Sequence, residues 1–167
     1  AVALLENMGR AIPSVSSIER VNSPDCGEHL LIRAFCDDNK SDGATLILGH
    51  TDTVHPRGAL SAQPGLRVNG ERLYGPGIFD MKASCVIALE VLRCLTELAL
   101  NPQRPVTLLL TCDEEIGSAT GRPLVEDEAR DAAQVLVLEP PAPGGSVKTA
   151  RKGVGVWTVA AQGVASH

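Results

Sequence analysis

The chain has 167 residues, of which 44% are hydrophobic and 21% are charged, and its net charge is −5 at pH 7. These values are typical of a single globular domain, and an acidic chain without a basic stripe is not expected to bind nucleic acid. No apolar run approaches the length that crosses a bilayer, so we expect no membrane contact.

Apolar patterning predicts helices that alternate with strands, which is typical of an α/β fold with a mostly parallel sheet. In chain order, we expect a helix at Val2–Arg10, strands at 29–35 and 44–49, short β pieces at 66–68 and 72–74, a long helix from Met81, a strand at 106–110, a short helix near 122–130 and a strand at 134–138. In the long helix, apolar residues recur at intervals of three and four until Asn101-Pro102 ends the pattern.

The composition changes after Glu139, and this change predicts a domain boundary. Pro140 to Gly145 is rich in Pro and Gly and resembles a linker. Residues 154–161 alternate loosely, which predicts a strand. We therefore expect one domain over residues 1–146 and the start of a second over residues 147–167.

The five cysteines form neither a CxxC pair nor a paired framework. An odd number of scattered cysteines is typical of reduced thiols and favours the cytoplasm, with the periplasm as the alternative. Cys112 adjoins three consecutive acids, and we interpret it as a spacer and not as a ligand.

Three predicted strands end in side chains that can bind a metal ion. These side chains are His50 with Asp52, Glu114 with Glu115, and Glu139. Ligands usually sit at the carboxyl ends of the strands in α/β sheets, and acids at a buried position are costly unless a positive charge meets them. The three strand ends therefore predict a metal site at one edge of the sheet.

Asp80 is a further candidate, at the start of the long helix. Gly75-Pro-Gly77 before it is not a dinucleotide-binding loop, because the third glycine is missing and Asp80 is negative where a phosphate would sit. The structural alternatives are that Asp80 caps the helix and that residues 113–115 form a solvated acidic turn.

Histidine and carboxylates together suit zinc or a similar divalent ion. A carboxylate shared by two ions brings them to about 3.5–4 Å, where they can activate a water and polarise a carbonyl. Glu114 and Glu115 point different ways on an extended backbone, so one could bind a metal while the other reaches a metal-bound water. Asp52, on the same side of the strand as His50, could accept a hydrogen bond from the ring nitrogen that binds no metal.

Two other histidines lack partners at ligand spacing. We expect His55 to lie in a loop near the rim of the site and His29 to lie on the ordinary surface. Neither is expected to bind a metal.

Five ordered motifs carry a family resemblance. They are Gly49-His-Thr-Asp-Thr-Val54, Gly75-Pro-Gly-Ile-Phe-Asp-Met-Lys82, Asp113-Glu-Glu-Ile-Gly-Ser118, Leu138-Glu-Pro140 and Gly163-Val-Ala-Ser-His167. From about His29 to its last residue, the chain resembles the dizinc aminoacylase and exopeptidase family, which includes acetylornithine deacetylase, succinyl-diaminopimelate desuccinylase and glutamate carboxypeptidase. It is most similar to the glutamate carboxypeptidase (carboxypeptidase G) branch.

The resemblance implies a three-layer zinc-exopeptidase catalytic domain, incomplete here, followed by the first strands of an α+β lid and dimerisation domain. It implies two Zn²⁺ ions per active site, with Co²⁺ or Mn²⁺ as possible substitutes. His50 and Glu139 would bind one zinc, Asp80 would bridge both, and Glu115 would bind the second. A small peptide or acylated amino acid would be the substrate, and the lid domain would form a homodimer.

The resemblance also implies catalytic roles. Asp52 would orient His50. Glu114 would be the general base, which takes a proton from the bridging water and passes it to the departing amine. His167 would reach the active site of a neighbouring subunit and steady the oxyanion.

Two departures from the family pattern stand out. Ala83-Ser84 occupies positions where two glycines are common, which alters packing at the start of the helix. The family's remaining histidine ligand and its substrate-carboxylate arginine lie far downstream, after the lid domain. We therefore expect this chain to be the N-terminal portion of a longer enzyme, poorly metallated and nearly inactive by itself.

The expected activity is metal-dependent hydrolysis of an amide bond to an amino acid, in a carboxypeptidase that releases C-terminal glutamate or a similar residue. An N-acyl-amino-acid deacylase of the same family is the alternative. A non-catalytic metal-binding relative would have no need for a non-ligating carboxylate such as Glu114. A purely structural module, whose acids cap helices, predicts no zinc uptake and unchanged stability in chelator.

Overall fold

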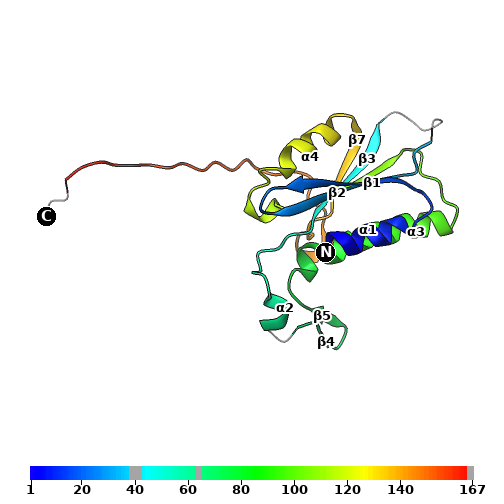
Figure 1. Cartoon of the computed structure of the whole chain (residues 1–167), viewed down its shortest axis with the longest axis horizontal. Coiled ribbons are helices and arrows are strands. Elements are labelled where there is room, and N and C mark those ends of the chain that lie inside the picture. Colours follow the sequence, from blue (N-terminus) through cyan, green and yellow to red (C-terminus); the bar gives the residue numbers. More distant parts are fainter. Residues whose placement is uncertain (38–42, 63–64, 165–167) are drawn as a thin grey trace.

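The computed structural model describes residues 1–37, 43–62 and 65–164 (Figure 1). Its centre is a five-stranded sheet with the strand order β1-β2-β6-β3-β7. The strands are β1 (Val15–Ser23), β2 (Gly27–Ala34), β3 (Ala44–His50), β6 (Val106–Thr111) and β7 (Ala132–Val137). β3 pairs in parallel with β6 and with β7, whereas β2 is antiparallel to β1 and to β6. All strands of this sheet except β2 therefore share one direction, which confirms the mostly parallel sheet.

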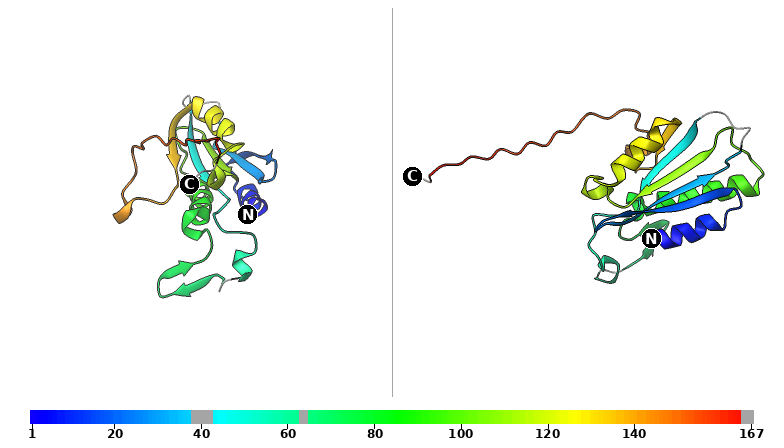
Figure 2. Two further views of the ribbon diagram at one scale, coloured as in Figure 1. Left: turned by 90° about the vertical axis from the view of Figure 1, so that its left-hand side faces the viewer. Right: turned by 45° about the horizontal axis from the view of Figure 1, so that its top comes forward.

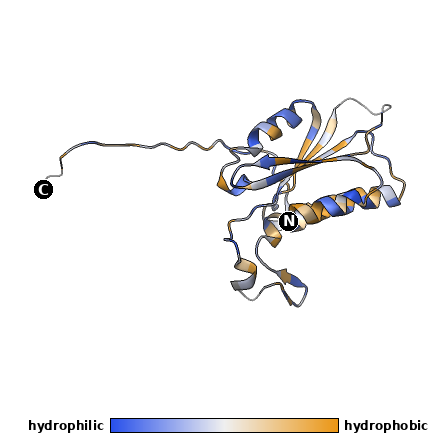
Figure 3. Cartoon of the chain, in the orientation of Figure 1, coloured by the Kyte–Doolittle hydropathy of each residue, from blue (hydrophilic) through white to orange (hydrophobic). Residues whose placement is uncertain are grey.

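Helices cover both faces of the sheet and give three layers (Figures 1 and 2). α1 (Val2–Arg10) and α3 (Ala83–Glu97) lie on one face, and α4 (Gly121–Arg130) lies on the other. Because both faces of its central strands are covered, β6 is buried at every position. Figure 3 shows that α4 is largely hydrophilic, as expected of a helix with one face in water. Within the described ranges, no helix combines the length and the apolar character needed to cross a bilayer.

Two apolar clusters join the layers, because successive side chains of β2 and β6 point to opposite faces of the sheet. Those on the side of α1 and α3 include Leu30, Ile32, Leu108, Leu110, Cys85, Leu89 and Leu92. Those on the side of α4 include Leu31, Leu46, Leu109, Leu124 and Val125. Burying each large apolar side chain contributes about 1.5–3 kcal/mol, so the clusters fix the frame that carries the strand ends.

Between β3 and α3 the chain leaves the sheet. This excursion contains α2 (Ala59–Ala62) and a hairpin of β4 (Arg67–Asn69) and β5 (Arg72–Tyr74). It returns through an irregular helical turn, Ile78–Lys82, in which Asp80 has the extended backbone angles φ −121° and ψ 96°. The turn leads directly into α3 and brings Asp80 back to the edge of the sheet.

The strand expected at residues 154–161 is not formed. Among the described residues, 147–164 contain neither helix nor strand and run away from the sheet as an extended segment (Figure 1). A strand is stable only when another strand satisfies its N–H and C=O groups, and no described strand pairs with residues 154–161. The domain boundary near residue 147 stays a prediction.

Candidate metal centre

The candidate site lies at the edge of the sheet where β3, β6 and β7 end. His50 is the last residue of β3, Glu114 begins a one-turn helix after β6, and Glu139 follows β7. Asp80 comes from the turn before α3. Because β3 is parallel to both of its neighbours, their carboxyl ends meet at one edge.

The Nε2 atom of His50 is surrounded by carboxylates. Asp80 Oδ1 lies 3.1 Å away, Glu139 Oε1 lies 3.4 Å away, and Glu114 Oε2 lies 4.0 Å away. The imidazole is 1% exposed, whereas the side chains of Asp80 and Glu114 are about half exposed. One buried ring therefore presents a single nitrogen to a partly open group of acids.

The other ring nitrogen, Nδ1, faces Asp52. It donates a hydrogen bond to the backbone carbonyl of Asp52 at 3.1 Å, and Asp52 Oδ1 lies 3.4 Å away. With the proton assigned to Nδ1 in this way, the lone pair of Nε2 points at oxygens that also carry lone pairs. Such an arrangement needs a proton or a cation between the groups. A neutral imidazole nitrogen with carboxylate oxygens is a donor set that fits a divalent metal.

The electrostatics of the acids point to the same need for positive charge. Burial acts to lower the pKa of His50, but Glu139, Asp52 and Glu114 outweigh it and hold this pKa above its ordinary value. Burial raises the pKa of Glu139, and repulsion from Asp80 and Glu114 raises it further, against the opposing effect of His50. A bound cation would stabilise both groups in their deprotonated forms.

The backbone of His50 is tied to the segment that carries Asp80. Its N–H donates to Met81 Sδ at 3.3 Å, and its carbonyl accepts from Cys85 Sγ at 3.2 Å. Gly49 permits this close approach, because a Cβ at that position would lie 2.9 Å from Met81 Cε. The end of β3 and the turn before α3 are therefore held together as one unit.

Three of the four residues predicted to bind metal form one group. The ligand atoms that all lie within 4.8 Å of one another belong to His50, Asp80 and Glu139. Glu115 is not a member of this group, and its backbone N–H donates to Asp52 Oδ2 at 2.9 Å. His167, predicted to act on the oxyanion, lies outside the described residues.

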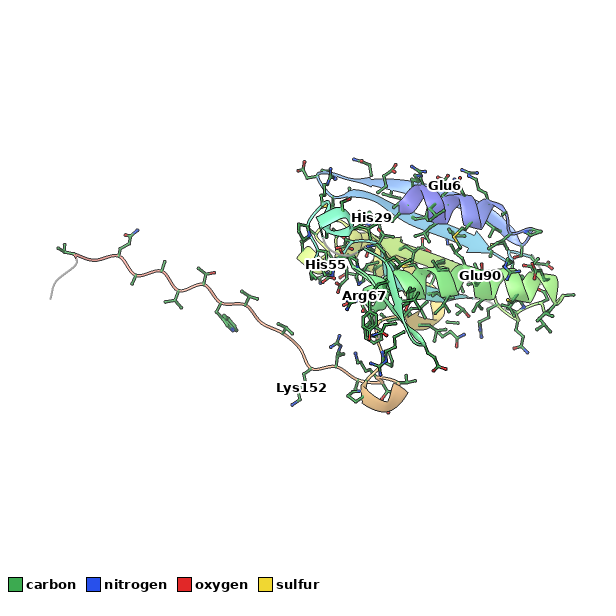
Figure 4. The ribbon with its side chains drawn as sticks, turned by 90° about the horizontal axis from the view of Figure 1, so that it is seen from below. Glu6, His29, His55, Arg67, Glu90 and Lys152 are labelled. Carbon is green, nitrogen blue, oxygen red and sulfur yellow. The ribbon has the colours of Figure 1, made fainter. Side chains whose placement is uncertain are left out.

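The expectation that His29 lies on the surface is wrong. It is 1% exposed, because β2 is covered on both faces. Its Nε2 lies 2.9 Å from Thr120 Oγ1, and its Nδ1 accepts from the N–H of Cys112 at 3.1 Å. His55 is exposed and lines a pocket of about 370 Å³ beside the turn before α3. Figure 4 shows both histidines toward the same end of the sheet.

A family model described as peptidase family M20/M25/M40 matches residues 46–157, which is more than half of the chain. The chain belongs to this family. The match includes the strand ends and the turn that carry His50, Asp80, Glu114 and Glu139, and it confirms the resemblance that the motifs indicated.

Named relatives of this M20/M25/M40 chain are hydrolases. Carboxypeptidase G2 of Pseudomonas sp. (strain RS-16) is 37% identical over 123 residues, which cover 73% of this chain and 29% of the relative. Succinyl-diaminopimelate desuccinylase of Verminephrobacter eiseniae is 34% identical over 146 residues, which cover 78% of this chain and 35% of the relative. The chain thus spans about a third of the length of these relatives.

The fold of this M20/M25/M40 chain has solved counterparts. The M20 family metallo-carboxypeptidase Sso-CP2 from Sulfolobus solfataricus is 20% identical and superimposes with a TM-score of 0.64. The superposition covers 86% of this chain and 32% of the solved one. At this identity the likeness concerns the fold, and it confirms the α/β catalytic-domain architecture.

Proposed function

We propose that this chain contributes to the active site of a metal-dependent hydrolase that cleaves an amide bond to an amino acid. The observation that carries the proposal is the group of acids around His50 Nε2, where oxygens of Asp80, Glu139 and Glu114 lie within 4.0 Å. A structural module gives no reason for acids to converge on one buried imidazole, because their mutual repulsion opposes folding. Membership of a peptidase family supports hydrolysis as the chemistry.

The proposed cofactor is a pair of Zn²⁺ ions, and Co²⁺ or Mn²⁺ can accept similar ligands. His50 and Glu139 would hold one ion, Asp80 would be shared, and Glu115 would belong to the second. When bound, the ions polarise the scissile carbonyl and lower the pKa of a water. Asp52 keeps the ring proton on Nδ1, so that Nε2 remains available as a ligand.

Glu114 is the proposed general base. Its Oε2 lies farther from His50 Nε2 than the oxygens of Asp80 and Glu139, and its side chain is 48% exposed. Its carboxylate can therefore approach a water or a substrate without acting as a ligand. It would accept a proton from the attacking water and deliver it to the departing amine. His167 is proposed, from the family resemblance, to stabilise the oxyanion.

The first proposed substrate is a peptide or acyl compound with C-terminal glutamate, because the chain is 37% identical to carboxypeptidase G2. A second candidate is an N-acyl amino acid, which the 34% identity to a succinyl-diaminopimelate desuccinylase favours. We also propose a homodimer formed through the segment that starts near residue 147. The five free cysteines support a reducing compartment such as the cytoplasm.

The decisive experiment uses the full-length protein reconstituted with zinc and assayed against N-acyl-glutamates and N-acyl derivatives of basic amino acids. Glu114→Gln should lower kcat by about 10²–10⁴-fold, because a general base contributes about that much, while the zinc content stays at the wild-type value. Glu97→Gln, at an exposed position near the end of α3, is the matched control and should change neither quantity. Normal turnover by Glu114→Gln would contradict the role of Glu114.

A further inference from the structure

A largely buried network of polar side chains, centred on the half-buried Thr120, lies directly behind the loop that carries Glu114 and Glu115. It joins Ser23 at the end of β1, His29 in β2, and Thr120 at the start of α4 to Asp113. Ser23, His29 and Asp113 are each at most 2% exposed, and none of the four belongs to the proposed metal ligands. Polar groups buried in this way are costly unless they are fully paired, so their arrangement needs an explanation.

The hydrogen bonds of the network all run in one direction. The N–H of Cys112 donates to His29 Nδ1, which leaves the ring proton on Nε2. His29 Nε2–H can then donate to Thr120 Oγ1 at 2.9 Å, and Ser23 Oγ–H can donate to the same oxygen at 2.5 Å. With both acceptor positions filled, the Thr120 hydroxyl has one proton left, and it donates this proton to Asp113 Oδ2 at 2.8 Å.

Asp113 Oδ2 also accepts two backbone bonds from the start of α4. The N–H of Thr120 lies 2.7 Å away and the N–H of Gly121 lies 3.1 Å away. A carboxylate is favoured there because the amino end of a helix carries partial positive charge. The carbonyl of Asp113 accepts from the N–H of Ser118 at 2.8 Å, which closes the loop around residues 114–117.

The two glutamates therefore lie between two anchored carboxylates. On one side, Asp113 is fixed to α4, and on the other, the N–H of Glu115 donates to Asp52 Oδ2 at 2.9 Å. Asp52 also faces Nδ1 of His50. The backbone of the loop is thus aligned with the ring of the first proposed ligand.

We propose that Asp113, Thr120 and His29 form a clamp of positioning residues, which holds the Glu114–Glu115 loop in register with His50. The inference rests on the proposed function, since it assigns the clamp to a base and a ligand of that function. The clamp residues touch neither substrate nor metal. They act by fixing the loop backbone. The Glu114 carboxylate is then already in position when substrate binds, and no conformational entropy is lost in placing it.

Gly121 offers an independent way to disturb the clamp. A Cβ at this position would lie 2.6 Å from Asp113 Oδ1 and 2.9 Å from Thr111 Cγ2. Both contacts are shorter than real Cβ atoms make, so Gly121→Ala must displace the Asp113 carboxylate or the start of α4. This change alters no polar atom of the clamp itself.

The test uses the full-length, zinc-loaded protein and compares Thr120→Val, Thr120→Ser and Gly121→Ala. Thr120→Val removes the donor to Asp113 and should lower kcat by about 10–100-fold with little change in KM, as is typical when the support of a site residue is lost. Thr120→Ser keeps the hydroxyl and should recover most of the rate. Gly121→Ala should resemble Thr120→Val.

Thr96→Val is the matched control. Thr96 Oγ1 bonds to Ser14 Oγ at 2.6 Å and donates to the carbonyl of Leu92 at 2.8 Å, far from the site near the end of α3. Its loss should lower the melting temperature about as much as Thr120→Val does, without lowering kcat. A difference in kcat between Thr120→Val and Thr96→Val, at similar melting temperatures, is therefore expected only if Thr120 positions the site.

Cobalt titration of the metal-free protein provides a readout besides activity. If Glu115 is misplaced in Thr120→Val, the second equivalent of Co²⁺ should bind about 10-fold or more weakly, and its visible absorption should change, while the first equivalent binds as in the wild type. If Thr120→Val matches Thr96→Val in kcat and in its cobalt spectrum, the clamp is refuted and the proposed function stands. A wild-type protein that neither binds metal nor hydrolyses any substrate refutes both.

Discussion

His50 shows how individual residues of this chain are specialised. Its backbone N–H and carbonyl are bonded to Met81 and Cys85, and its Nδ1 is bonded to Asp52. The remaining polar atom, Nε2, faces acids. The hydrogen bonds to Met81, Cys85 and Asp52 therefore fix the ring and leave the lone pair of Nε2 directed at the candidate metal position.

The supporting role of Cys85 predicts an unreactive thiol. Burial raises the pKa of Cys85 to about 11, and the residue is 1% exposed. At pH 8 roughly one Cys85 in 10³ is a thiolate, which is the reactive form. Timed alkylation of the folded protein with iodoacetamide, followed by peptide mass spectrometry, should label the exposed Cys36 and Cys94 first. Equal labelling rates for Cys85 and Cys36 would show that the packing around His50 opens readily.

Sequence patterns predict the residues of the site better than they predict the residues that support them. His50, Glu114 and Glu139 could be placed together, because each follows an apolar strand and parallel strands end at one edge. The bond between His29 and Thr120 joins residues 91 positions apart, and no pattern in the sequence marks His29 as buried. Such a contact follows from the antiparallel insertion of β2, which composition and spacing do not reveal.

At the scale of elements, α1 is attached to the sheet by ion pairs between side chains as well as by apolar contacts. Glu6 of α1 accepts hydrogen bonds from Arg10 and from Arg20 of β1, and Arg20 also bonds to Glu28 of β2. Figure 4 shows Glu6 on the helix beside the blue strands. Hydrogen bonds from Arg10 and Arg20 hold the pKa of Glu6 below its usual value, although burial acts in the opposite direction.

This arrangement predicts a pH-dependent role for Glu6. Because its pKa is lower in the folded than in the unfolded state, the carboxylate stabilises the fold above the usual value of 4.5, and the stabilisation is lost as the pH falls toward the folded pKa. Glu6→Gln should therefore lower the melting temperature clearly at pH 7 and less at pH 3, measured by circular dichroism. Glu90→Gln, which breaks an exposed pair with Arg93, serves as the control with a small effect. A Glu6→Gln deficit that is the same at both pH values would contradict the pairing.

Sequence patterns miss a strand or helix when its apolar residues do not recur at the regular spacing of that element. Sequence patterns do not indicate β1, because its apolar residues Val15, Ile18 and Val21 are spaced by three and do not alternate as in most half-buried strands. The register shift between Val15 and Ser17 accounts only for the spacing between Val15 and Ile18. Conversely, residues 154–161 have a strand-like pattern, but none of the described strands pairs with them. Pairing, and not local pattern, decides both cases.

At the scale of the whole molecule, apolar burial stabilises the three layers, whereas the repulsion among the acids of the candidate site destabilises the fold. The three layers bury apolar side chains on both faces of the sheet, whereas the carboxyl edge collects acids in a chain whose net charge is already −5. Burial raises the pKa of Glu139, and repulsion from the neighbouring acids Asp80, Glu114 and Glu115 raises it further. The metal-free site is therefore expected to oppose folding, and a bound cation should reverse this effect.

Divalent metal should consequently stabilise the protein. A ligand present at 100 times its dissociation constant adds about 2.7 kcal/mol, which raises the melting temperature of a chain of this size by about 5–10 °C. Zinc added to the chelated full-length protein should produce a rise of this order, and chelator should reverse it. Asp80→Asn should remove most of the rise, since it replaces one oxygen of the group around His50. Glu126→Gln, in an exposed pair with Arg122, should leave it intact. A melting temperature that is indifferent to both zinc and chelator would favour a purely structural module, because acids that only cap helices gain nothing from a metal ion.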